Sequence, residues 1–217
     1  IKQPSRTALG VLFEVWGEDA LKRIDLPAVR DFSDDQLRVF RRMLSSGLNA
    51  PVTSSAGRLF DAIASLTGLR QRASFEGQAA MELEFAIETT STASYPFEIH
   101  DGPPLIIDWG PAVKSIVSDI SSGERAGSIS AKFHNTLAEI VRAVALRIGE
   151  AKIVLTGGCF QNRYLTEACL QRLLDAGFRP YWHQRVPPND GGISLGQVIA
   201  AAARARSSVA PNQLATA

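Results

Sequence analysis

The chain has few residues that cross-link a protein or bind zinc. Its 217 residues include two cysteines, Cys159 and Cys169, and three histidines, and no CxxC pair is present. Neither cysteine has a histidine at zinc-ligand spacing, which argues against a zinc finger and a disulfide-rich scaffold. Because both cysteines lie in or beside apolar runs, we expect reduced, mostly buried thiols in a cytoplasmic protein.

Long apolar runs and an excess of one charge are absent as well. No run approaches the ~18 apolar residues of a membrane-spanning helix, and no signal-peptide pattern opens the chain. Lysine and arginine number 23 against 22 acidic residues and are scattered. We therefore expect neither a membrane nor a nucleic acid as partner. The length suits one domain or one lobe of a larger protein, and the start at Ile1 without methionine suggests a fragment.

Helical patterns fill the first half of the chain. Ser33 and Gln36 have the spacing of a capping box, and Gly47 is placed to end the same helix. Hydrophobic periodicity and stop signals predict the remaining helices. The helices are expected over residues 6–16, 34–46, 57–66 and from 74 onward. We predict a mainly helical subdomain over residues 1–95.

Strand patterns enter after Tyr95. The segment "FEIHDGPPLIID" predicts two short strands joined by a turn at 101–104. Later, a strand, helix, strand and helix follow one another, which predicts a parallel pair with a right-handed crossover. The expected strands are 153–155 and 179–183, and the expected helices are 111–120, 128–148, 161–176 and 192–203. We predict an α/β fold overall, with an α/β nucleotide-binding lobe over 96–206 and a frayed tail over 207–217.

The segment "IVLTGGCFQNRYL" passes from a predicted strand into two glycines and then into a helix. Open α/β sheets bind ligands at the carboxyl ends of their strands, and free N–H groups at a helix start attract anions. Gly157 and Gly158 would let a phosphate or ribose approach the backbone, and Asn162 could offer its amide. A tight turn without a ligand explains the glycine pair equally well, and no Walker or GxGxxG motif is present.

The segment "VPPNDGGISLGQ" forms a second corner, between the last predicted strand and the last helix. Spacing alone favours Asp190 as the N-cap of that helix. Alternatively, its carboxylate ligates a metal beside a phosphate site.

Five segments in order closely resemble the C-terminal part of HypF, the carbamoyltransferase family of nickel–iron hydrogenase maturation. They are "TSSAGRLFDAIASLTG", "FEGQAAMELE", "AKFHNTLAE", "LTGGCFQNRYL" and "VPPNDGGISLGQ". The resemblance runs from about Arg6 to Ala203. It implies the C-terminal lobe of an ASKHA fold, the actin-like and sugar-kinase-like fold that tRNA threonylcarbamoyladenosine transferases share.

The resemblance also implies a reaction. In this family an upstream domain makes carbamoyl-adenylate from carbamoyl phosphate and ATP. The ASKHA domain then transfers the carbamoyl group to the C-terminal cysteine thiol of HypE, and the product becomes the hydrogenase cyanide ligand. The expected cofactors are ATP or carbamoyl-adenylate and a divalent zinc, iron or magnesium ion. The expected partners are HypE and the missing amino-terminal lobe and upstream domains, without which the isolated chain should be inactive.

The resemblance places the family's functional positions on nine residues of this chain. The nucleotide-binding positions are Gly57, Arg58, Asp61, Glu76, Gly77, Gly157, Gly158 and Asn162. The metal-coordinating aspartate falls on Asp190. Asp61 corresponds to a carboxylate near the ribose, and Glu76 with Gly77 to a second loop that lines the nucleotide.

The chain departs from the related transferases in its histidines. Those enzymes take their other metal ligands from an HxxxH helix, which is absent from this sequence. His100, His134 and His183 are too far apart in sequence to replace it, so the remaining ligands are expected outside the chain. We expect His134 to be a satisfied histidine at the edge of the core and Cys159 to be structural.

No residue stands out as a general base, so two alternatives stay open. One is the nucleotide-binding lobe of a small-molecule kinase of the same fold. The other is a non-catalytic, nucleotide-gated docking lobe.

Overall fold

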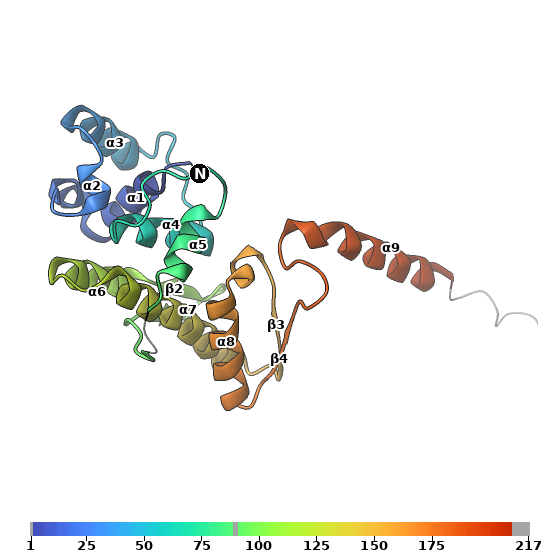
Figure 1. Cartoon of the computed structure of the whole chain (residues 1–217). Helices are drawn as coiled ribbons and strands as arrows, with labels where there is room; N and C mark the ends of the chain where they lie inside the picture. Colours follow the sequence, from blue (N-terminus) through green and yellow to red (C-terminus); the bar gives the residue numbers. More distant parts are fainter. Residues whose placement is uncertain (1, 89–90, 210–217) are drawn as a thin grey trace, which may run out of the picture.

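The computed structural model describes residues 2–88 and 91–209 (Figure 1). Helices occupy the first part of the chain, as predicted. They are α1 (Pro4–Trp16), the 3-10 helix η1 (Gly17–Lys22), α2 (Pro27–Arg30), α3 (Asp34–Ser46), α4 (Ala56–Leu66) and α5 (Gln78–Phe85). Strands and helices alternate in the second part, in the order β1 (Glu98–His100), β2 (Ile106–Asp108), α6 (Gly110–Ser121), α7 (Ala126–Ile148), β3 (Lys152–Leu155), η2 (Gly158–Gln161), α8 (Arg163–Asp175), β4 (Arg179–Trp182), η3 (Asp190–Gly192) and α9 (Ile193–Val209).

Local signals account for most of these boundaries. Ser33 and Gln36 form the predicted capping box, and Gly47 ends α3 in the left-handed conformation. The predicted start of α5 near residue 74 was wrong, and the helix begins at Gln78. Gly77 has a φ of +82° and therefore breaks the helical path immediately before it.

A single hydrophobic core joins the two parts of the chain. Leu12 of α1 and Ile63 of α4 are buried at its helical end, and Phe133 of α7 and Leu173 of α8 continue it into the second part. Helix α1 packs closely on α4, while α6 contacts α1 and α5 contacts α7. The division into units near residue 95 remains a prediction.

The described residues form two sheets of two strands each. The hairpin β1–β2 is antiparallel, with Glu98 opposite Asp108, and β3–β4 is parallel, with Leu155 opposite Trp182. The predicted parallel strand–helix–strand unit is thereby confirmed, and α8 packs on α7 and β4. The fold is α/β, as predicted. None of the described helices has the length and apolarity to cross a membrane.

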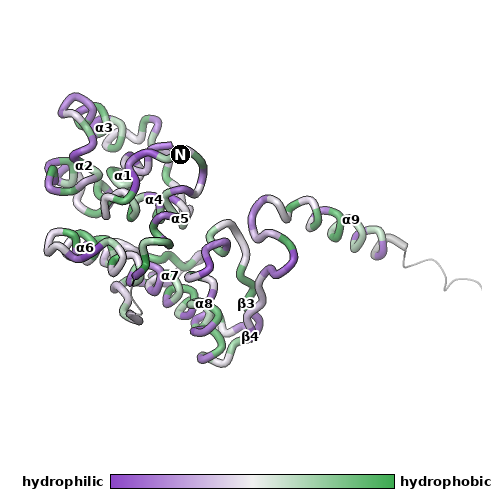
Figure 2. The backbone as a smooth tube through the Cα atoms, viewed as in Figure 1, coloured by the Kyte–Doolittle hydropathy of each residue, from purple (hydrophilic) through white to green (hydrophobic). Residues whose placement is uncertain are grey.

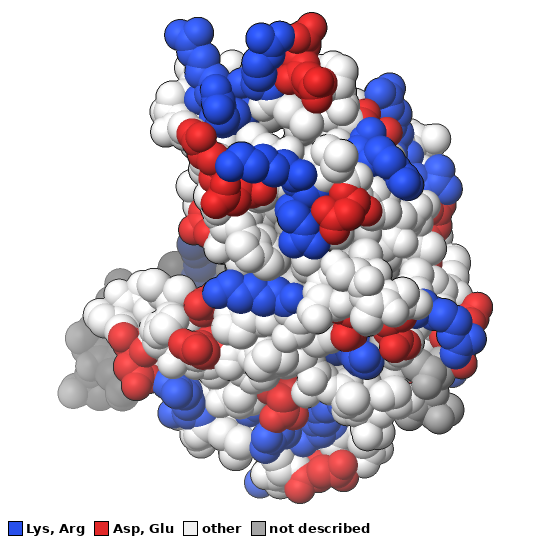
Figure 3. All heavy atoms as spheres, turned by 90° about the vertical axis from the view of Figure 1, so that its left-hand side faces the viewer, with Lys and Arg blue, Asp and Glu red and all other residues white. Residues whose placement is uncertain are grey.

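Helix α9 is longer than predicted and stands away from the other helices (Figure 1). It includes residues 207–209, which the sequence placed in a frayed tail, and residues 210–217 lie outside the described part of the chain. Hydrophobic residues recur along it (Figure 2). On the face in Figure 3, basic and acidic side chains are interspersed.

Candidate functional site

A cavity of about 330 Å³ lies at the carboxyl ends of β3 and β4. One wall is the turn after β3, which contains Gly157 and Gly158, and the other is the loop after β4, which leads to Asp190. The structure thus brings together the two corners that the sequence singled out separately. Parallel strands explain this, because their carboxyl ends lie at the same edge of the sheet.

The glycines of these corners have different physical roles. Gly157 has a φ of +102°, and its N–H donates to the Pro188 carbonyl oxygen at 2.8 Å, which links the two walls. A Cβ on Gly158 would have no heavy atom within 4 Å. In the second loop, a Cβ on Gly192 would lie 2.7 Å from the Pro187 oxygen, so the loop requires glycine there. The space beside Gly157 and Gly158 is open, whereas Gly192 is required by close contact within its own loop.

Asp190 is not the helix cap that its spacing favoured. The preceding Asn189 is the cap, and its side-chain oxygen accepts from the Gly191 N–H at 3.1 Å. Asp190 occupies the first position of η3, is exposed and lines the cavity. Within the described chain its carboxylate has neither a hydrogen bond nor an ion pair. The carboxylate is therefore available to a ligand or metal.

Two cavity residues were missed from the sequence. Thr156 directly follows β3 and His183 directly follows β4, and Thr156 Oγ1 lies 2.9 Å from His183 Nε2. Both residues come immediately after predicted neighbouring strands, and this position could have indicated that they line the site. This pair adds a hydroxyl and an imidazole to a cavity that otherwise offers backbone, amide and carboxylate groups.

The start of α8 does not offer free N–H groups to a ligand, contrary to our expectation. The Asn162 side-chain oxygen accepts from the Leu165 N–H at 2.7 Å. Glu84 of α5 accepts from the N–H groups of Arg163 and Tyr164 at 2.7 and 3.1 Å. The carboxylate of another helix thus occupies the place where an anion would bind.

Asn162 itself is part of a buried network. Its Nδ2 donates to His134 Nε2 at 2.8 Å, and His134 Nδ1 donates to the Ser130 carbonyl oxygen at 2.7 Å. His134 is fully buried, and burial lowers its pKa to about 4. The prediction of a satisfied histidine is confirmed, although it lies within the core and not at its edge. Asn162 lies outside the residues that line the cavity, and its role toward a nucleotide remains a prediction.

Four of the other predicted positions gather around α4. Arg58 Nη1 lies 2.8 Å from Asp61 Oδ2, and the Asp61 side chain is 6% exposed. Burial raises the Asp61 pKa, while Arg58 lowers it and the nearby charge of Glu76 raises it. Gly57 belongs to the first turn of the same helix.

This group lies near the first wall but does not line the cavity. Helix α4 contacts η2, which begins at Gly158. Gly77 precedes α5, the helix that packs on α4. The Nη1 atom of Arg58 is buried and faces Asp61 Oδ2 in an ion pair, without the geometry of a hydrogen bond.

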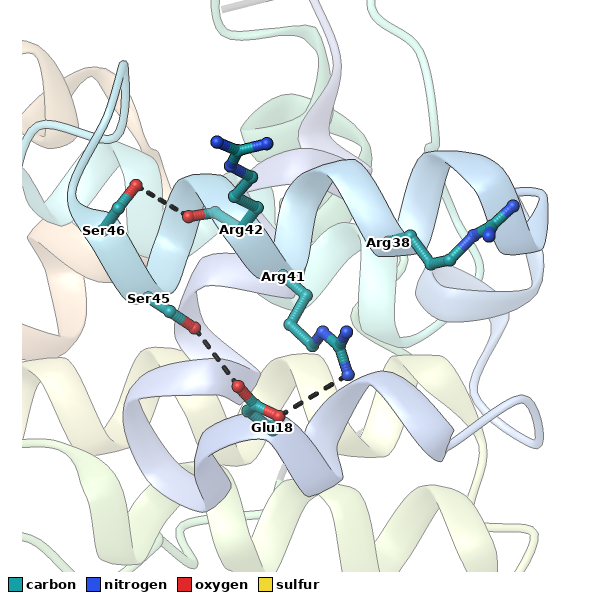
Figure 4. Close-up of a pocket in the computed structure, with 6 residues that line it drawn as sticks. All are labelled: Glu18, Arg38, Arg41, Arg42, Ser45 and Ser46. Atoms are coloured by element: carbon teal, nitrogen blue, oxygen red, sulfur yellow. Dashed lines mark hydrogen bonds and ion pairs between the residues drawn. The ribbon is translucent and has the colours of Figure 1, made fainter.

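A larger hollow of about 580 Å³ lies elsewhere, on the surface of α3 (Figure 4). Arg41 and Ser45 contact Glu18 of η1 at 3.8 and 3.4 Å. Arg38 points away from this pair in Figure 4 and pairs with Asp35. Because long exposed side chains form this hollow, its shape depends on their rotamers, and we do not take it as the functional site.

The cysteines match the prediction of free thiols. Cys169 is buried, and burial raises its pKa to about 12. Cys159 is half-buried, and burial raises its pKa as well. A raised pKa reduces the thiolate fraction, so neither cysteine is activated as a nucleophile.

Comparisons with known proteins identify similar chains. Residues 1–197 match the family described as "Carbamoyltransferase, Kae1-like Domain, second subdomain". The chain is 38% identical over 214 residues to carbamoyltransferase HypF of Synechocystis sp., covering 92% of this chain and 28% of that protein. It is 37% identical over 209 residues to HypF of Rhodobacter capsulatus, covering 89% of this chain and 26% of the relative.

Solved structures give the same match. A full-length HypF in a phosphate- and nucleotide-bound form superposes with a TM-score of 0.84 at 39% identity, covering 93% of this chain and 26% of that one. HypF of T. kodakarensis gives a TM-score of 0.75 at 25% identity, covering 92% and 27%. The chain therefore spans about a quarter of the length of these relatives.

Proposed function

The chain belongs to the HypF carbamoyltransferase family, and on this premise we propose that it is the nucleotide-binding part of an enzyme that carbamoylates a thiol. The donor is carbamoyl-adenylate, which the longer protein makes from ATP and carbamoyl phosphate. The acceptor is the C-terminal cysteine of HypE, in the cytoplasmic synthesis of the hydrogenase cyanide ligand. The observation that carries the proposal is the cavity between Gly158 and Asp190 at the edge of the parallel sheet.

We assign the approach of the nucleotide phosphate or ribose to Gly158. The open space beside it supports this role, as does the nucleotide-bound state named for the similar solved HypF. The Gly157 N–H is already bonded to Pro188, so we assign this glycine to the turn. At about 330 Å³ the cavity is at the small end of ligand sites, which span ~300–1,000 Å³. Other surfaces should therefore complete it.

We assign one of those surfaces to the start of α4. The Nη1 of Arg58 faces Asp61, but the side chain is 25% exposed and has further N–H donors, and guanidinium groups bind phosphate and hydroxyl oxygens well. Asp61 accepts from a ribose hydroxyl in this assignment, while Glu76 and Gly77 line the same nucleotide. The contact of α4 with η2 supports a shared site.

Asp190 would hold a divalent metal, with its other ligands outside this chain. Asp190 suits a metal ligand because its carboxylate is unpaired in the described structure and lines the cavity. A bound cation would stabilise negative charge on carbamoyl or phosphate oxygens. Gly158 and Asn189 shape the walls on either side and so orient the donor next to that carboxylate.

The partner within the longer protein is the first subdomain implied by the description "second subdomain". We propose that it covers the exposed side chains of Val154, Tyr181 and Trp182 on the sheet and of Val198 and Ile199 on α9. Parallel sheets are normally covered on both faces. Helix α9 stands away from the other helices, so its exposed apolar side chains also lack a covering surface within the described chain (Figure 1).

Substitution of Asp190 by asparagine in the full-length protein tests the proposal. Because Asn189 and not Asp190 caps η3, the substitution should change stability by well under ~1 kcal/mol. It should remove metal and abolish thiol carbamoylation together. The measurements are elemental analysis and carbamoylation of HypE from ATP and carbamoyl phosphate.

The matched control is Asp175→Asn, which removes an exposed carboxylate at the end of α8 that accepts from Gln171. This variant should keep metal and activity. Full metal content and normal turnover in Asp190→Asn would refute the ligand assignment. Phosphorylation of a small molecule without thiol carbamoylation would instead indicate a kinase.

A further inference from the structure

We propose that Glu98, His100 and Asp108 form a surface site for a divalent transition-metal ion such as Zn²⁺ on the β1–β2 hairpin. One ligand atom from each residue lies within 4.8 Å of the other two. None of the three residues lines the cavity of the proposed carbamoyltransferase site. The inference therefore does not depend on the proposed function.

The strand register creates the cluster. Glu98 and His100 are two residues apart on β1, so their side chains share one face, and Asp108 is directly opposite Glu98 on β2. His100 Nε2 lies 4.0 Å from Glu98 Oε2 and 3.8 Å from Asp108 Oδ2. The imidazole thus faces both carboxylates.

The two carboxylates on this face of the hairpin favour the binding of a cation. Like charges directly opposite each other in an antiparallel pair destabilise it, and Glu98 and Asp108 are such a pair. Within residues 2–88 and 91–209, their ion-pair contacts are to His100 alone. Arg147, which reaches the same hairpin, pairs with Asp101 instead. One imidazole carries at most a single positive charge and cannot balance two carboxylates, whereas a divalent ion bound by all three groups can.

Asp108 is held in position by a group outside the cluster. Its Oδ1 accepts from the Gly110 N–H at 2.7 Å, which leaves Oδ2 toward His100. A Cβ on Gly110 would lie 2.9 Å from that Oδ1, so the glycine permits the close approach. Fixing one ligand before the ion arrives lowers the ordering cost of binding.

The ligand set selects the class of ion. One imidazole nitrogen with two carboxylate oxygens suits zinc and its neighbours, whereas Ca²⁺ and Mg²⁺ prefer oxygen ligands alone. Ligand atoms around a tetrahedral zinc are about 3.4 Å apart, given metal–ligand distances near 2.1 Å. The separations of 3.8 and 4.0 Å between His100 and the carboxylates must therefore shorten by roughly half an ångström, and that between the two carboxylates, which is within 4.8 Å, by up to about 1.4 Å. Side chains that are 64%, 55% and 44% exposed can move this far, with water as fourth ligand.

Zinc binding to the 217-residue chain tests this site. Isothermal calorimetry with ZnCl₂ at neutral pH should show a binding event that weakens at least tenfold in His100→Gln and in Glu98→Gln. Asp101→Asn is the matched control, because it removes an exposed carboxylate of the same hairpin outside the cluster and should bind like the native chain. Circular dichroism of each variant checks that the fold is kept.

Cobalt gives an independent readout. Co²⁺ bound through His100 should produce visible d–d absorption that is lost in His100→Gln and kept in Asp101→Asn. Zinc affinity and cobalt absorption that are the same in His100→Gln as in the native chain would overturn the proposal, because any binding would then lie elsewhere. A native chain that binds neither ion would overturn it too.

Discussion

Acidification should destabilise the protein through one buried imidazole, that of His134. Burial lowers its pKa from 6.5 to about 4 in the folded chain. Both ring nitrogens are hydrogen-bonded in the neutral form, and Nε2 accepts a hydrogen bond, so a second ring proton would break the bond from Asn162. Between these two pKa values the unfolded state binds a proton that the folded state does not. The free energy of unfolding therefore falls as the pH drops from 6.5 to 4.

The magnitude follows from the shift of the pKa. A difference of 6.5 minus about 4 corresponds to about 3 kcal/mol once the pH lies below both values. At pH 5 the loss relative to pH 7 is about 2 kcal/mol by the same relation. For a protein of ordinary stability this is a large fraction of the total.

Urea unfolding of the native chain and of His134→Gln at pH 7, 6 and 5 measures this effect. The variant keeps every other titrating group, so the difference between the two chains isolates His134. The native chain should lose its advantage over the variant by roughly 2 kcal/mol from pH 7 to pH 5. A difference that stays constant would refute the reasoning. NMR of the native imidazole, expected to stay neutral down to pH 5, gives a second readout that does not depend on the variant's folding.

Two further predictions concern glycines. A Cβ on Gly127 would lie 2.3 Å from the Ala86 carbonyl oxygen, so Gly127→Ala should destabilise the fold by ~1–3 kcal/mol. A Cβ on Gly10 would meet nothing within 4 Å, so Gly10→Ala should stabilise the fold by up to ~1 kcal/mol. Thermal melts measure both changes. Gly158→Val should keep the circular dichroism of the full-length protein but lose ATP and AMP affinity by calorimetry. Unchanged affinity would leave the two glycines as a turn device.

The elements that sequence patterns predicted best carry their determinants locally. The capping box of Ser33 and Gln36 and the left-handed Gly47 act within one turn of their helix, so neighbouring residues suffice to predict them. The parallel pair of strands followed from the order of elements alone. The start of α5 failed because the left-handed Gly77 interrupts an otherwise helical pattern.

The errors in the candidate site come from contacts between distant residues. Nothing near Arg163 indicates that Glu84, 79 positions earlier, fills the start of α8. The partner of Asn162 is likewise 28 positions away. Asn189 and Asp190 are both good caps, so spacing could not decide between them. For Arg163 and Asn162, tertiary packing chose among partners that the local sequence left equivalent.

The buried network around His134 explains how the helical part positions the glycine corner. Ser130 Oγ donates to the carbonyl oxygen of Leu83 in α5, and the Ser130 carbonyl accepts from His134 in the same helix α7. His134 in turn accepts from Asn162, whose oxygen caps α8 at Leu165. Because these groups are buried, displacing one member of the network leaves a buried polar group unsatisfied, at ~1–3 kcal/mol. The start of α8 is thereby fixed to α5 and α7, and the turn at Gly157–Gly158 is fixed by its connection to that start. Buried residues of α5, α7 and α8 thus fix the position of the glycine turn that lines the cavity.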